Sequence, residues 1–433
     1  MRRIFKGLIV CLILCSTVFS SFQVLADEIE VSSGAAILMD LKSGRVLFEK
    51  NADDKNFPAS TTKIMTAILA IENLEYDMVL TASETAIDID RDGSNMGILN
   101  GEMLTVEQLL YGLLVHSAND AANVLAEAVS GSISEFVVLM NDKAKELGMT
   151  NTSFINAHGY HHAEHYMSAR DLAILSSYAM KNEKFRAIVQ TPTYEIPPTE
   201  KYQETRYLSS NNMLINPMKG RKYLYSPAKG IKTGHTNDAG FCLASYAEKD
   251  GASYICVTMN APIDENDNHS FKDTINLFEY GFKNYKVKTI SDAGEILATA
   301  PVKWSSGDAY VSLTTYVALE ALLPADFKEE DIKTNINLSE KIKAPIKAGD
   351  VLGSIEYSFQ ETPLGTVDLI AIKDVKRSFF KMIFGSIFDF IFSAWVMIPF
   401  FTIVVILLLV RSYNMRKRRK MRQLKRRQNR NLF

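Results

Sequence analysis

One stretch near the C-terminus constrains this chain more than any other. Residues 390–410 form a run of 21 residues without a charged side chain, which is long enough to cross a bilayer as a helix. Residues 411–433 follow with eleven lysines and arginines and no acidic residue. Cytoplasmic segments beside a membrane span carry such a positive excess. We therefore predict a transmembrane helix over 390–410, a basic cytoplasmic tail over 411–433 and a main body that faces outward.

The N-terminus has the pattern of a secretory signal peptide. Arg2, Arg3 and Lys6 precede a mostly apolar run that ends in small residues before Asp27, as signal sequences do. We predict a signal peptide over residues 1–26, which agrees with an outward-facing body.

The uneven charge distribution limits the possible partners. The body between the two basic ends is acidic, and a basic run directly after a membrane span favours a cytoplasmic tail over a nucleic-acid-binding arm. We expect membrane attachment and no nucleic acid partner.

The body divides into two predicted domains. Residues 27–287 hold a hairpin, several capped helices and then strands followed by a further helix, which indicates an α/β domain with a helical lobe. Residues 288–374 hold short strands and turns, which predict a small all-β domain. Residues 375–389 mix basic and aromatic residues, as amphipathic segments on a membrane surface do. The predicted fold class is therefore multi-domain α/β.

Cys242 and Cys256 lie on two neighbouring predicted strands. A disulfide across the hairpin and two buried free thiols both fit this placement, because the register of the strands cannot be read from the sequence.

The first candidate site is a serine and a lysine three residues apart. Ser60 and Lys63 stand at the start of a helix whose apolar stripe includes Ile64 and Ile68, so both side chains are expected on one face. A serine hydroxyl becomes a nucleophile when a base stands beside it. By itself this spacing is common, and Ser60 would serve equally well as a helix N-cap.

Two further motifs follow along the chain. Ser117 and Asn119 stand at a bend between two predicted helices, where both residue types also serve as caps. Lys232, Thr233 and Gly234 lie on a predicted strand beside a hairpin, where a lysine is also an ordinary edge-strand charge. The order and contexts of the three motifs together indicate acyl-transfer chemistry.

With these motifs the chain resembles the penicillin-binding D-alanyl-D-alanine carboxypeptidases, serine enzymes that trim bacterial peptidoglycan stem peptides. The resemblance extends over roughly residues 30–375 as a motif-level comparison and includes Pro58-Ala59, His158-Gly159 and Asp171-Leu172-Ala173. It implies a β-lactamase or transpeptidase-like α/β domain with a helical lobe, followed by a β-rich domain. Its expected ligands are stem peptides ending in D-Ala-D-Ala and β-lactam antibiotics, and no cofactor is required.

The resemblance also assigns a role to each motif residue. Ser60 would be the acyl-ester nucleophile and Lys63 its general base, with a pKa lowered by burial and nearby positive charge. Ser117 and Asn119 would relay the proton to the leaving amine and hold the substrate amide. Lys232 and Thr233 suit a terminal carboxylate. Gly234 leaves room for another backbone, and the N–H groups of Ser60 and His235 would form an oxyanion hole.

Three alternative functions are also compatible with the sequence. His158, His161, His162 and His165, with Glu164 among them, suggest a zinc hydrolase, although their spacing does not fit a His-Glu-x-x-His helix. A β-lactamase shares the three motifs but needs rapid deacylation, which a glutamate can promote through a water molecule. Glu164 is the candidate for that role. A wall-binding protein that has lost its activity is the third.

Overall fold

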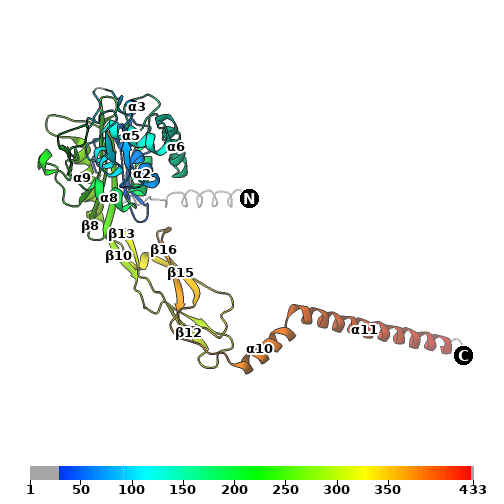
Figure 1. Ribbon diagram of the computed structural model, residues 1–433. Coiled ribbons are helices and arrows are strands. Elements are labelled where there is room, and N and C mark those ends of the chain that lie inside the picture. The colour runs from blue at the N-terminus through cyan, green and yellow to red at the C-terminus, as the bar shows by residue number, and fades with distance from the viewer. Residues whose placement is uncertain (1–28, 91, 431–433) are drawn as a thin grey trace, which may run out of the picture. The chain divides into compact units, whose positions relative to one another are not determined.

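The computed structural model describes residues 29–90 and 92–430, and the predicted signal peptide lies outside these residues. The chain divides into two compact units, Met1–Lys286 and Val287–Phe433 (Figure 1). The predicted multi-domain α/β class is confirmed.

An antiparallel sheet organises the first unit. Its strand order is β2-β1-β9-β8-β7, so strands from the beginning and the end of this unit lie in one sheet. The bounds are β1 Ala35–Asp40, β2 Val46–Lys50, β7 Ala228–Thr236, β8 Gly240–Lys249 and β9 Ala252–Ala261. The predicted hairpins between β1 and β2 and between β8 and β9 are present.

Helices cover both faces of this sheet, which explains why every residue of β1 is buried. Ala35, Ile37 and Met39 share one core with α2 (Lys63–Asn73) and its neighbours. Leu38 points the other way, toward Gly281 of α9 (His269–Asn284), where a Cβ added to the glycine would stand 3.1 Å from Leu38 Cδ2. The alternation follows from the two-residue period of a strand.

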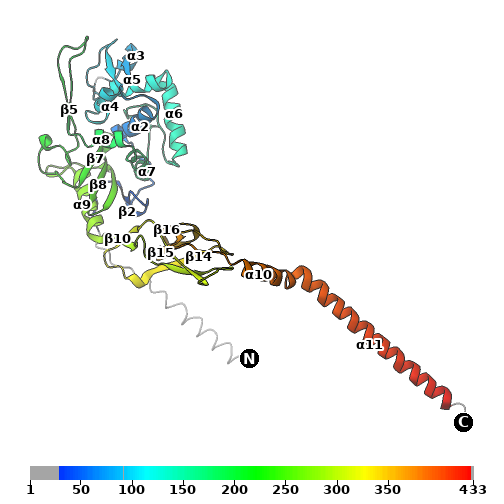
Figure 2. The same cartoon turned by 60° about the horizontal axis from the view of Figure 1, so that its bottom comes forward.

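A helical lobe adjoins one side of the sheet. Helices α3, α5 and α6 lie together and apart from α9 in both views (Figures 1 and 2). The helices of this lobe and its surroundings are α3 Glu84–Ile87, α4 Val106–Leu114, α5 Asn119–Ser130, α6 Ile133–Glu146, α7 Ala169–Ala179 and α8 Glu183–Val189. A capping box opens α4, where Thr105 and Gln108 exchange both hydrogen bonds. Ser132 and Ser168 cap α6 and α7 with their side chains.

Two short strand pairs complete the first unit. They are β3 Val79–Thr81 with β4 Met103–Thr105, and β5 Thr193–Ile196 with β6 Arg206–Ser209. Cys242 and Cys256 are buried free thiols, and their strands are paired so that Cys256 stands opposite Ser245. Of the two alternatives, a disulfide and two buried free thiols, the structure therefore shows the free thiols.

The second unit carries a sheet of its own, in the order β11-β12-β16-β15-β14, and a separate pair of strands, β10 and β13. Inward-facing aliphatic residues such as Val311, Leu313 and Leu369 form its core. The bounds are β10 Tyr285–Ser291, β11 Ala298–Pro301, β12 Tyr310–Thr314, β13 Leu319–Pro324, β14 Ile332–Leu338, β15 Val351–Phe359 and β16 Thr362–Ala371.

Two helices follow this sheet. α10 spans Phe379–Ile391 and α11 spans Ala394–Arg430, so the uncharged run of residues 390–410 begins in one helix and continues in the next. The break falls at Ser393, whose N–H and hydroxyl both donate to the carbonyl of Phe390. Within the described part of the chain, one single helix, at Ala394–Arg422, is long and apolar enough to cross a membrane.

Candidate active site

Ser60 lies in a tight turn immediately before α2. Residues Ala59–Thr62 form a 3-10 helix, and the N–H and hydroxyl of Thr61 both donate to the carbonyl of Pro58, at 3.2 and 2.7 Å. Ala59 has a φ of 48°, a left-handed conformation that non-glycine residues seldom adopt. The turn fixes the serine at the N-terminal end of a helix whose apolar face is buried.

Lys63 joins Ser60 to two other segments. Its Nζ donates to Ser60 Oγ at 2.9 Å, to Asn119 Oδ1 at 2.7 Å and to the carbonyl of His158 at 2.7 Å. The side chain is completely buried. Three acceptors therefore hold the amine against the serine hydroxyl.

The surroundings of Lys63 favour the neutral amine. Burial, followed by the positive charge of Lys232, lowers the pKa of Lys63 well below its usual value, and the carboxylate of Asp120 opposes this shift. Burial also lowers the pKa of Lys232 to about 7. An uncharged lysine keeps two N–H donors, enough for Asn119 Oδ1 and the His158 carbonyl. Its lone pair can then accept the proton of the Ser60 hydroxyl, which is what a general base requires.

Ser117 and Asn119 lie in the turn between α4 and α5. Asn119 is the first residue of α5 and Ala118 its N-cap, without a side-chain capping bond, so the asparagine amide is not used as a cap. Ser117 has a φ of 68° and is 5% exposed. The turn places Ser117 two residues before an asparagine whose Oδ1 accepts from Lys63 Nζ.

Strand β7 brings the third motif to the Ser60 turn. A Cβ added to Gly234 would stand 2.9 Å from the carbonyl oxygen of Pro58 and 3.0 Å from the backbone nitrogen of Ser60. The strand therefore approaches the turn as closely as a glycine allows. Lys232 is 2% exposed and donates to the carbonyl of Thr233 at 2.8 Å, so it is a buried amine rather than an ordinary edge-strand charge.

A pocket of about 460 Å³ opens over the serine. Its lining combines three of the predicted site residues with the segments 92–94, 158–161 and 236–238, which the three motifs do not include. The lining residues are Ser60, Asp92, Gly93, Ser94, Asn119, His158, Gly159, Tyr160, His161, His235, Thr236, Asn237 and Asp238. Of the eight predicted site residues, Ser60, Asn119 and His235 line the pocket, and Lys63 is hydrogen-bonded beneath it.

The four clustered histidines have separate contacts. His165 is buried and lies 2.9 Å from Thr62 Oγ1 through Nε2, while its Nδ1 accepts from the N–H of Ile155. Burial lowers the pKa of His165 to about 4, so the ring is neutral at physiological pH. Within residues 29–90 and 92–430, no three His, Cys, Asp or Glu side chains are grouped so as to hold a metal ion.

Gly159 packs against the Ser60 turn from this histidine-bearing loop. It has a φ of 85°, and an added Cβ would stand 1.8 Å from the carbonyl oxygen of Ala59. No other residue fits that position without moving the turn. The loop whose His158 carbonyl accepts from Lys63 therefore also packs directly against the turn that holds Ser60.

The sequence matches a known family over most of the first unit. The family described as D-alanyl-D-alanine carboxypeptidase matches residues 22–263, more than half of the chain. The chain belongs to the D-alanyl-D-alanine carboxypeptidase family. A second family, described as the C-terminal domain of penicillin-binding protein 5, matches residues 285–377.

Individual carboxypeptidases match nearly end to end. The D-alanyl-D-alanine carboxypeptidase DacF of Bacillus subtilis is 31% identical, over 88% of this chain and 96% of its own length. DacC of Escherichia coli is 29% identical over 91% of this chain and 97% of its own. Penicillin-binding protein 5 of Haemophilus influenzae has a similar structure, with a TM-score of 0.64, 26% identity and coverage of 81% of this chain and 100% of its own. The predicted serine D-alanyl-D-alanine carboxypeptidase is thereby confirmed at the level of the family.

Several residues around this carboxypeptidase site lie outside the three sequence motifs. Gly93 and Ser94 form a wall of the pocket, and Asp120 is a buried carboxylate directly after Asn119. Asp120 immediately follows a motif residue, but its burial cannot be read from the sequence. The 92–94 segment is polar and irregular in sequence, and its position depends on contacts with distant residues.

Proposed function

We propose that this carboxypeptidase removes the terminal D-alanine from peptidoglycan stem peptides through an acyl-enzyme on Ser60. The observation that carries the proposal is the 2.9 Å contact between Lys63 Nζ and Ser60 Oγ. Lys63 is a buried amine with a lowered pKa, so it can take the hydroxyl proton as the oxygen attacks.

In the acylation step, Ser60 Oγ attacks the carbonyl carbon of the penultimate D-alanine and its proton passes to Lys63. The N–H groups of Ser60 and His235 would stabilise the negative carbonyl oxygen. The proton then reaches the nitrogen of the terminal D-alanine through the hydroxyl of Ser117. The C–N bond breaks, D-alanine leaves and an ester remains on Ser60.

The second step restores the serine. Water attacks the ester carbonyl, gives one proton to Lys63 and releases the shortened peptide, and Ser60 Oγ recovers its proton from the lysine. A β-lactam follows the same first step, in which its ring amide opens and Ser60 is acylated. Lys232 and Thr233 would bind the terminal carboxylate that both kinds of ligand carry.

Release of D-alanine from a synthetic acyl peptide ending in D-Ala-D-Ala tests this proposal. We expect turnover with that peptide, no release from the L-Ala-L-Ala analogue and no effect of a metal chelator. A purified protein that binds the peptide without releasing D-alanine would contradict the proposal in favour of a wall-binding role. Inhibition by the chelator would instead favour a zinc hydrolase.

Bound penicillin separates the carboxypeptidase from a β-lactamase. We expect one penicillin per active site and slow release, because Glu164, the glutamate named for rapid deacylation, is exposed and absent from the pocket lining. Rapid, repeated hydrolysis of penicillin would contradict this expectation.

We also propose that the helix starting at Ala394 crosses the cell membrane, with the catalytic unit outside and the basic tail in the cytoplasm. The positive residues from Arg411 onward support this orientation. Protease added to intact cells should cleave the catalytic unit and leave an epitope at the C-terminus untouched. Loss of that epitope from outside would show that the chain does not span the membrane.

A further inference from the structure

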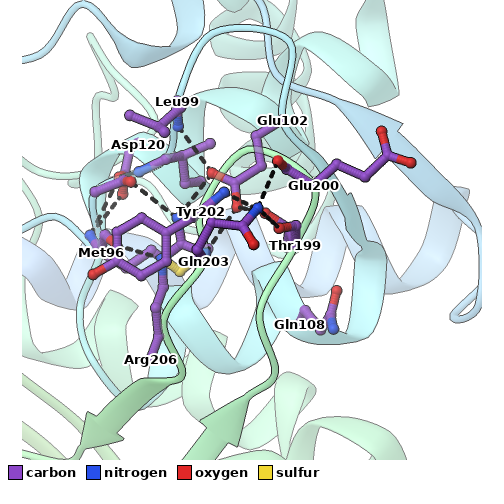
Figure 3. A network of polar contacts seen from close by, with 12 residues as sticks. Met96, Leu99, Glu102, Gln108, Asp120, Thr199, Glu200, Tyr202, Gln203 and Arg206 are labelled. Carbon is purple, nitrogen blue, oxygen red and sulfur yellow. Dashed lines mark hydrogen bonds and ion pairs between the residues drawn. The ribbon is translucent and has the colours of Figure 1, made fainter.

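A buried ion pair lies behind the wall of the catalytic pocket. The guanidinium of Arg206 donates from Nη1 and Nη2 to the two oxygens of Glu102, each at 2.8 Å. Glu102 is fully buried and Arg206 is 5% exposed. Figure 3 shows Arg206 extending from β6 toward Glu102, and the Tyr202 ring centroid lies 3.9 Å from the guanidinium carbon.

Arg206 also holds a loop by its backbone. Its Nε donates to the carbonyl of Met96 at 2.9 Å, and Nη2 donates to the carbonyl of Gly97 at 3.0 Å. From the other side, the Asp120 carboxylate accepts the N–H groups of Met96 and Ile98, at 3.2 and 3.0 Å. Residues 96–98 are therefore fixed through both their carbonyl and their amide groups (Figure 3).

The same loop continues into the pocket wall and contacts Asn119. The carbonyl of Ser94 accepts the N–H of Asn119 at 2.8 Å, and a Cβ added to Gly93 would stand 2.5 Å from Asn119 Nδ2. The amide oxygen of Asn119 in turn accepts from Lys63 Nζ. A continuous set of contacts thus connects the Arg206 guanidinium to the base that serves Ser60.

Stability alone does not account for an ion pair in this place. Apolar residues of similar volume often replace a buried pair at no cost in stability, because two charges must be taken out of water. A methionine in place of Arg206, however, could not donate to the Met96 and Gly97 carbonyls. The loop requires donors in fixed positions for these two carbonyls, and a planar guanidinium supplies them.

We propose that Arg206 and Glu102 are positioning residues for acylation, which hold residues 92–98 so that Asn119 stays on Lys63. The proposal rests on the proposed function, since it concerns the rate at which Ser60 is acylated. It assigns to the pair an effect on chemistry at a site that neither residue touches.

The test uses full-length protein with Arg206→Lys, and with the double replacement Arg206→Met and Glu102→Leu. The lysine keeps the positive charge but lacks the several N–H donors of the guanidinium. The double variant removes the whole ion pair, so that no unpaired charge is left buried. The matched control is Arg186→Lys, which alters a partly exposed arginine near Glu183. Fluorescent penicillin counts the active sites, and acylation rates are expressed per active site, so unfolded protein does not enter the rate.

We expect both variants to acylate at least about tenfold more slowly per active site, a loss of the order seen when positioning is disturbed. The control should keep the wild-type rate. A wild-type rate per active site in either variant would overturn the proposal, whatever the change in melting temperature, and would leave a structural role only. Absence of labelling in the unaltered protein would instead count against the proposed function itself.

Discussion

Replacement of Ser60 by alanine is expected to abolish both D-alanine release and covalent labelling by penicillin. The hydroxyl oxygen becomes part of the ester, and this is the oxygen that lies 2.9 Å from Lys63 Nζ. Alanine has no oxygen at that position. Loss of a serine nucleophile typically costs about 10⁴-fold or more in rate. Steady-state release of D-alanine and gel detection of fluorescent penicillin measure the two effects.

The control for this prediction is Ser134→Ala, a change on the exposed side of α6. It should label and turn over like the unaltered protein. Because Ser60 lies in a turn whose hydrogen bonds come from Thr61, the alanine variant should also keep its melting temperature. Labelling that survives in a folded Ser60→Ala protein would contradict the assignment.

Replacement of Lys63 by arginine is expected to slow acylation by about 10²–10⁴-fold, the range attributed to a general base. Arginine keeps the positive charge and the donors, but it stays protonated and cannot accept the serine proton. Lys143→Arg is a suitable control, since that lysine forms ion pairs with Glu72 and Glu146 away from the pocket. The second-order rate of acylation by penicillin, per active site, is the measurement.

The pH dependence of acylation adds a second test of Lys63. Burial and the charge of Lys232 lower the pKa of this lysine well below 10.5, so the neutral base is present above that lowered pKa. The rate should therefore rise as pH increases through that lowered pKa, below the range where an ordinary lysine titrates. It should fall again above about pH 7, where Lys232 loses the charge that binds the terminal carboxylate. Lys63→Arg should lose this rise. An arginine variant that keeps both the rate and the profile would rule Lys63 out as the base.

Much of the site could be predicted because the decisive contacts are local or lie on recognisable elements. Ser60 and Lys63 are three residues apart at a helix start, and their side chains meet as that spacing requires. The three motifs were placed correctly on a helix start, a bend and a strand. Membership of the carboxypeptidase family followed from the order of these motifs.

The rest depended on contacts between distant residues. Glu102 and Arg206 are 104 positions apart. Nothing in the sequence distinguishes either residue from a charged residue on the surface. Likewise, the histidines at 158 to 165 are crowded in sequence, yet His165 turns inward to Thr62 and the His158 carbonyl faces Lys63. Such contacts are set by packing of loops, for which periodicity carries no signal.

The membrane end differs from its prediction for a local reason. Residues 390–410 are uniformly uncharged, so hydropathy alone suggests one continuous helix. Ser393 instead caps the carbonyl of Phe390 and begins a new helix, since Val396 and Met397 both donate to its carbonyl. A serine that bonds its neighbouring backbone in this way competes with the continuing helix.

Mapping the acylated residue tests the central claim most directly. Full-length protein is incubated with penicillin and digested, and the modified peptide is sequenced by mass spectrometry. We predict one opened β-lactam per chain, attached to Ser60 in the peptide that also holds Lys63. An adduct on another residue, or D-alanine release by a protein that never carries an adduct on Ser60, would contradict the account.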